Sequence, residues 1–146
     1  MKRIEHLRAL SSDHHHALAL ARLARRTAVG KEPIGPDEMW QEVIDRFRRD
    51  LSRHFAIEEK YLLPEMKKAG QDELVERTLD DHKAIGELVA SKEGPTRWRL
   101  AAFGAMLNAH VKFEENELFE KAQECLPDEA LEVIAKAHAE IEDGRD

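Results

Sequence analysis

The chain has 146 residues, a length typical of one domain of about 100 to 200 residues with a buried core. Charged residues make up 36% of it and the formal net charge is −7, so we expect no basic surface for a nucleic-acid backbone. No apolar run approaches the roughly 20 residues that cross a bilayer, and the first ten residues lack the apolar core of a signal peptide. We therefore expect a cytoplasmic protein that binds neither nucleic acid nor a membrane.

The composition favours helices along the whole chain, because aromatic residues make up only 5% and Ala, Leu, Glu, Lys and Arg are frequent. Glycine and proline interrupt the pattern at Gly30 to Pro36, Gly70, Gly94-Pro95 and Pro127. Residues 1–10 are expected to form an N-terminal arm. The sequence then predicts helices over residues 11–29, 37–63, 72–92, 96–125 and 128–142, with a short helical turn over residues 64–69.

Four long helices joined by short connections are typical of an antiparallel up-down-up-down four-helix bundle. The sequence thus predicts an all-α fold in which residues 11–125 form the bundle and residues 128–142 an additional C-terminal helix. We expect residues 1–146 to make up a single domain. In such bundles, ligand sites lie in the core between facing helices.

Polar residues interrupt the apolar faces of two of these helices. In the helix over residues 37–63, apolar residues recur every three or four positions, and His54 and Glu58 lie on the same face. The helix over residues 96–125 has the same kind of face, interrupted by His110 and Glu114. Both interruptions follow the pattern H-x-x-x-E-E, at residues 54–59 and 110–115.

The other two bundle helices extend this match to an internal repeat. Asp13-His14 and Asp81-His82 are each followed by apolar residues at the same offsets. The sequence therefore predicts that one half of the bundle resembles the other, and that a histidine from each remaining helix joins the two H-x-x-x-E pairs.

This arrangement predicts a metal centre in the core. Residues four apart on a helix have Cβ atoms about 5–6 Å apart, so each H-x-x-x-E presents an imidazole beside a carboxylate. Burying these carboxylates without a cation costs several kcal/mol each. Four imidazoles and two carboxylates exceed the about four ligands of a structural zinc, and they suit two non-haem iron ions. If both glutamates bridge the ions, an oxo or hydroxo bridge still leaves an open position for O2, NO or peroxide.

The ligand on the first helix remains open, because three consecutive histidines occupy residues 14–16. Successive residues point about 100° apart, so at most one or two of them reach the same centre. The repeat favours His14 through the shared Asp-His step, and the apolar spacing gives nearly equal support to His15. His16 ranks third.

In order and spacing, these motifs resemble the bacterial hemerythrin-like, HHE cation-binding proteins over nearly the whole chain. The opening Leu-Ser-Ser-Asp-His-His-His-Ala-Leu is also similar to that group. The resemblance implies a four-helix bundle with a non-haem di-iron centre, and it implies that the iron ligands include His54, Glu58, His82, His110 and Glu114. Oxygen-carrying hemerythrins have a second histidine near the position of His82, where this chain has Thr78 and Gly86. The pattern is closer to relatives implicated in iron-sulfur repair, nitric oxide response, or iron and oxygen sensing.

The leading hypothesis is a di-iron protein that binds or senses O2 or NO or handles iron. The alternatives are turnover of peroxide or NO, iron-sulfur repair, and a helical interaction module with a structural metal such as zinc. Glu59 and Glu115 are expected to contact solvent or to orient ligating histidines, because they lie about 100° from the ligand positions. His138 has no counterpart in the repeat and is expected on the surface.

Overall fold

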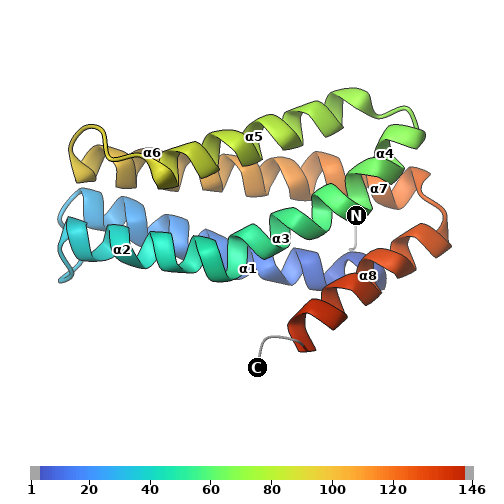
Figure 1. The fold of residues 1–146 in the computed structure, drawn as a ribbon, viewed down its shortest axis with the longest axis horizontal. Helices are drawn as coiled ribbons and strands as arrows, with labels where there is room; N and C mark the ends of the chain where they lie inside the picture. The colour runs from blue at the N-terminus through green and yellow to red at the C-terminus, as the bar shows by residue number, and fades with distance from the viewer. Residues whose placement is uncertain (1–3, 144–146) are drawn as a thin grey trace.

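The computed structural model describes residues 4–143, and the side chains of residues 4–140. In this part of the chain, all regular structure is helical. Four rods form a bundle, and a further helix, α8 (Asp128–Asp143), crosses obliquely at one end (Figure 1). The rods are α1 (Glu5–Ala28), residues 36–68, α5 (Asp72–Ala90) and residues 96–125. The predicted helical bundle with an additional C-terminal helix is confirmed.

The first helix starts earlier than expected. α1 begins at Glu5, so the arm predicted for residues 1–10 is wrong from this residue onward, and residues 1–3 lie outside the described part. The physical reason is burial, because Leu7 and Leu10 lie in the core beside residues of α7 and α8. Their spacing continues the apolar face of the helix towards the N-terminus.

Two of the rods contain π-helical turns. The second rod consists of α2 (Pro36–Arg46), η1 (Phe47–Leu51), α3 (Ser52–Ile57), η2 (Glu58–Leu62) and α4 (Leu63–Lys68). The fourth rod consists of α6 (Thr96–Phe113), η3 (Glu114–Leu118) and α7 (Phe119–Cys125). In η2 the backbone N–H of Leu63 donates to Glu58 O, and in η3 that of Phe119 donates to Glu114 O. Each turn therefore contains one residue more than an α-helical turn.

The rods end where glycine and proline predicted breaks. Gly30 and Gly70 have φ of 74° and 80°, in the left-handed region that glycine adopts without the steric penalty of a Cβ. Gly30 follows α1, and Gly70 separates α4 from α5. The resulting short connections return the chain alongside itself, so that neighbouring rods run antiparallel.

The core has two apolar layers with a polar layer between them. One layer lies toward the α1–α2 and α5–α6 connections and includes Leu20, Trp40 and Phe103. The other lies toward α8 and includes Leu10 and Leu118. Buried histidines and glutamates of all four rods lie between the two layers. Within the described residues, no helix is both long and apolar enough to cross a membrane.

Candidate metal centre

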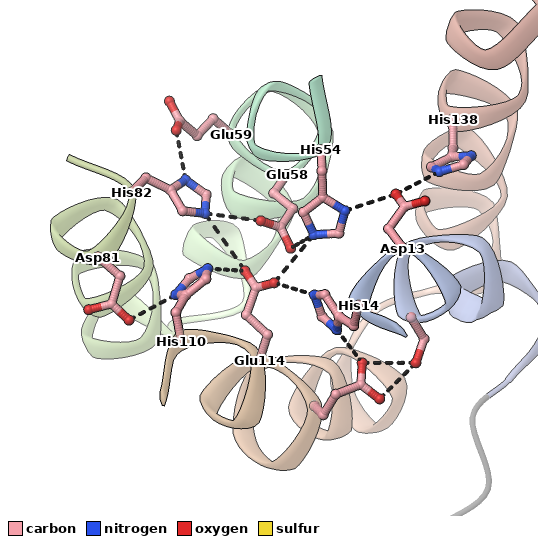
Figure 2. A network of polar contacts seen from close by, with 12 residues as sticks. Asp13, His14, His54, Glu58, Glu59, Asp81, His82, His110, Glu114 and His138 are labelled. Atoms are coloured by element: carbon pink, nitrogen blue, oxygen red, sulfur yellow. Dashed lines mark hydrogen bonds and ion pairs between the residues drawn. The ribbon is translucent and has the colours of Figure 1, made fainter. Parts of the chain in front are cut away.

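Six buried polar side chains converge between the apolar layers (Figure 2). Each of the four rods contributes one histidine, and the two rods with π-helical turns also contribute one glutamate each. The glutamates are 0% exposed, and none of the histidines exceeds 6%. The set is His14, His54, Glu58, His82, His110 and Glu114.

Each glutamate begins a π-helical turn, Glu58 in η2 and Glu114 in η3. Such turns occur frequently at functional sites. The extra residue shifts the helix face, so that the pairs Leu62-Leu63 and Leu118-Phe119 are both buried beyond the glutamates. The repeat H-x-x-x-E-E followed by two apolar residues thus has the same structural outcome in both halves.

The six side chains form two overlapping groups. The first group is His14, His54, Glu58 and Glu114, and the second group is Glu58, His82, His110 and Glu114. Within each group the possible ligand atoms lie within 4.8 Å of one another. Both groups contain both glutamates, so the two carboxylates are shared between the groups.

All four imidazoles direct Nε2 towards these carboxylates. His14 Nε2 lies 2.8 Å from Glu114 Oε1, and His110 Nε2 lies 3.1 Å from Glu114 Oε2. The Nε2 atoms of His54 and His82 lie 3.1 Å and 3.0 Å from the two oxygens of Glu58. His54 and His82 also approach Glu114, at 3.4 Å and 3.8 Å.

Several of these buried atoms have no hydrogen-bond partner among the described residues. They are both carboxylate oxygens of Glu58, Glu114 Oε2, His82 Nε2 and His110 Nε2. The short contacts of these atoms lack hydrogen-bond alignment, and an unsatisfied buried polar atom costs about 1–3 kcal/mol. Imidazole nitrogens and carboxylate oxygens that converge in this way are ligands for a transition metal. The residues present therefore fit a bound metal.

Each of the four imidazoles has a further carboxylate partner at its Nδ1 atom, on the side away from Glu58 and Glu114 (Figure 2). The Nδ1–H groups of His54 and His110 donate to Asp13 and Asp81, at 2.9 Å and 2.8 Å. Metal-binding histidines almost always donate their second nitrogen to such a partner, which fixes the tautomer and leaves Nε2 for the metal.

The remaining two imidazoles use the second glutamate of each H-x-x-x-E-E motif. His82 Nδ1–H donates to Glu59 at 2.8 Å, and His14 Nδ1–H donates to Glu115 at 2.7 Å. Ser11 Oγ–H also donates to Glu115. The expected role of Glu59 and Glu115 in orienting histidines agrees with these contacts. Each of the four outer contacts joins two different rods, and the internal repeat is reproduced in three dimensions.

The carboxylates favour protonated imidazoles in the metal-free chain. Burial lowers the pKa of His82, but Glu114 and Glu58 raise it by more, so that the pKa increases to about 10. The same balance of burial and neighbouring carboxylates raises the pKa values of His14, His54 and His110. Burial raises the pKa of Glu114, but the surrounding imidazoles bring it well below its usual range. Imidazolium charges thus balance the buried carboxylates. A bound metal would take the place of the protons on the imidazoles.

The structure distinguishes the consecutive histidines of α1. His14 lies in the cluster, whereas His15 and His16 are exposed and absent from both groups. The sequence gives His15 nearly equal support, but His15 lies outside this cluster because its position on the helix points it away from the core. The hydrogen bond from His14 to Glu115 and the ring stacking of Phe119 on His14 fix the rotation of α1.

His138 differs from the sequence expectation. The sequence predicts a surface position, but His138 is only 8% exposed and its Nε2 lies 2.9 Å from Asp13 Oδ2. A signal was present in the sequence, because His138 lies seven residues after Leu131 and four after Ile134, on the buried face of α8.

A cavity of about 400 Å³ borders the cluster, mainly at the first group, and His110 of the second group also lines it. Its lining includes His14, His54 and Glu114 together with apolar side chains such as Leu20 and Leu107. Arg46 and Arg49 also line it, and each of them pairs with an acidic neighbour. A small molecule in this cavity would contact the centre directly.

One comparison with known proteins decides the family. The hemerythrin HHE cation binding domain model matches residues 5–122. The chain belongs to this family. The match covers all four bundle rods up to Ala122 and ends before α8. Neither the curated proteins nor the solved structures gave a match.

In this hemerythrin HHE domain, the buried histidines and glutamates of the bundle core fit a metal site. The expected family and the presence of a fitting metal site are thus confirmed.

Proposed function

We propose that this hemerythrin-like protein holds two non-haem iron ions and binds or senses a small ligand such as O2 or NO. The observation that carries the proposal is the sharing of Glu58 and Glu114 by both ligand groups. A structural zinc needs about four ligands, whereas this site gathers four imidazoles and two shared carboxylates. Because the donors are nitrogen and oxygen without thiolate, the site suits iron.

In this proposal, His14 and His54 would hold one ion, His82 and His110 would hold the other, and the glutamates would contact both. A bound iron pair supplies redox chemistry and open coordination positions for the ligand. The protein keeps each Nε2 directed inward through the outer carboxylates and excludes bulk water by burial.

The cavity supports an exchangeable ligand at the first group. Its lining combines the imidazoles of His14 and His54 with apolar side chains such as Leu20 and Leu107 and with charged side chains such as Arg46. Ligand pockets typically join apolar walls to a few polar groups in this way. The cavity volume also admits peroxide, so turnover of peroxide is a second candidate function.

The test exposes anaerobically reduced, iron-loaded protein to O2, NO or peroxide and follows the visible spectrum in a stopped-flow instrument. We expect a fast spectral change with at least one of the gases and none with metal-free protein. Leu107→Trp, which would fill part of the cavity, should slow this change without reducing the iron content. A reduced, iron-loaded centre that stays unchanged with both gases would contradict the proposed ligand, and multiple turnovers with peroxide would favour the second candidate.

A further inference from the structure

Asp13 connects α8 to the candidate metal centre. Its Oδ2 atom lies 2.9 Å from His54 Nδ1 and also 2.9 Å from His138 Nε2 (Figure 2). A carboxylate has no proton to donate, so Asp13 accepts at this oxygen and both imidazoles donate an N–H to it.

Among the described residues, the other half of the bundle has no equivalent of this connection to α8. The equivalent residue, Asp81, accepts from His110, and its additional contact comes from Arg77 of the same helix. The Arg77 side chain is 48% exposed, so water can replace it. His138, by contrast, is buried and comes from a separate helix beyond the matched family region.

The His138 imidazole is buried, so its hydrogen bond to the partly exposed Asp13 affects the stability of docked α8. A buried imidazole N–H without a partner costs about 1–3 kcal/mol, so docking of α8 favours the position of Asp13 that accepts from His138. A carboxylate held by two donors has less freedom to rotate, and its hold on His54 becomes more directional. Partners that orient ligands in this way typically change metal affinity by about 10- to 100-fold.

We propose that His138 is a positioning residue for His54, that it acts through Asp13, and that it thereby ties α8 to the first ligand group. Asp13 and His54 also line the cavity, so the connection reaches the side where a ligand would enter. The effect on bound metal rests on the proposed function, whereas the positioning of His54 does not.

α8 has other anchors, which makes the proposal testable by substitution. Leu131 and Ile134 are buried in the apolar layer that also contains Leu10 of α1 and Leu62 of η2. We expect α8 to stay docked when only the imidazole of residue 138 is replaced. His138→Leu removes the donor and keeps an apolar side chain, whereas His138→Gln offers an amide N–H near the position of Nε2.

The first experiment uses metal-free full-length chain and records the imidazole N–H signals by NMR. In His138→Leu, the Nδ1–H signal of His54 should shift and exchange faster with water, while that of His110 stays unchanged. His138→Gln should restore the His54 signal. Ile134→Val, which weakens α8 packing without touching the hydrogen bond, should leave it in place. An unchanged His54 signal in His138→Leu would overturn the proposal.

The second experiment loads the same variants with Co²⁺ and measures its visible absorption and its dissociation rate. We expect a shifted spectrum and roughly tenfold faster loss of the less tightly held ion in His138→Leu, with both effects reversed in His138→Gln. Unchanged spectra and rates would overturn the effect on metal. Failure of the wild-type chain to bind Co²⁺ would count against the proposed function, and the NMR result would still decide the role of His138.

Discussion

Glu58 and Glu114 face each other in the core and belong to both groups of converging ligand atoms (Figure 2). Each begins a π-helical turn and each is fully buried. Because each histidine belongs to only one of the two groups, glutamates and histidines should differ in their effect on metal content.

Glu58→Gln and Glu114→Gln should each reduce the binding of both ions, because the altered side chain belongs to both groups. His82→Ala should mainly reduce binding to the second group, leaving close to one ion. Metal content after desalting, measured by elemental analysis, distinguishes these outcomes. An equal loss of metal in all three variants would show that the two groups do not each bind an ion of their own.

The two adjacent histidines of α1 provide a matched pair. His14→Ala should lower metal content and remove a buried partner of Glu114, whereas exposed His15→Ala should match wild type in both metal content and stability. Elemental analysis and thermal unfolding of both variants check this. A larger loss of metal in His15→Ala would contradict the position of α1.

Replacing a carboxylate that contacts a histidine Nδ1 should weaken metal binding less than replacing Glu58 or Glu114, but more than replacing a surface carboxylate. We expect Glu115→Ala to weaken metal binding by about 10- to 100-fold, because His14 loses the acceptor that orients it. Glu117→Ala makes the same charge change at an exposed position of η3 and serves as the control. Competition titrations with a chelator measure the affinities, and similar values for the two variants would argue against an orienting role.

The stability of metal-free protein should fall as the pH rises above neutral. The pKa of His82 increases from 6.5 to about 10 in the folded chain, so the folded state binds the proton more tightly than the unfolded state. The resulting stabilisation is fully present below about 6.5 and is lost as the pH rises through about 10. Urea unfolding at several pH values checks this dependence. His82→Gln should reduce the slope, and a rise in stability over this range would contradict the assignment.

Bound metal should stabilise the fold at neutral pH, because the ligand set is assembled only in the folded chain. The gain should reach about 2.7 kcal/mol when free metal is 100 times its dissociation constant. Melting curves of metal-free and loaded protein measure the difference. Identical curves would show that the buried cluster is equally stable without a cation.

Much of this site could be predicted from the sequence, because a helix converts spacing directly into direction. The repeat of H-x-x-x-E-E and of Asp-His placed His54, Glu58, His82, His110 and Glu114 on facing surfaces. The metal content, the two irons and their small ligand remain predictions.

The remaining features depend on tertiary contacts. The choice of His14 over His15 requires the rotation of α1, which Glu115 and Phe119 determine from another rod. The π-helical turns at Glu58 and Glu114 depend on burial of both residues of the apolar pair beyond each motif, and that burial requires the neighbouring rods. The role of His138 depends on the angle at which α8 crosses the bundle, and no repeat position predicted it. Leu7 and Leu10 were visible as a continuation of the apolar spacing, but their burial requires the rods around them.

The most direct test of the central claim is an anaerobic titration of metal-free protein with ferrous iron, followed by desalting and elemental analysis. Shared glutamates and four inward-facing imidazoles predict close to two irons per wild-type chain, and a large loss of both in Glu114→Gln. Saturation at one iron per chain, with Glu114→Gln unchanged, would contradict a centre built on two shared carboxylates.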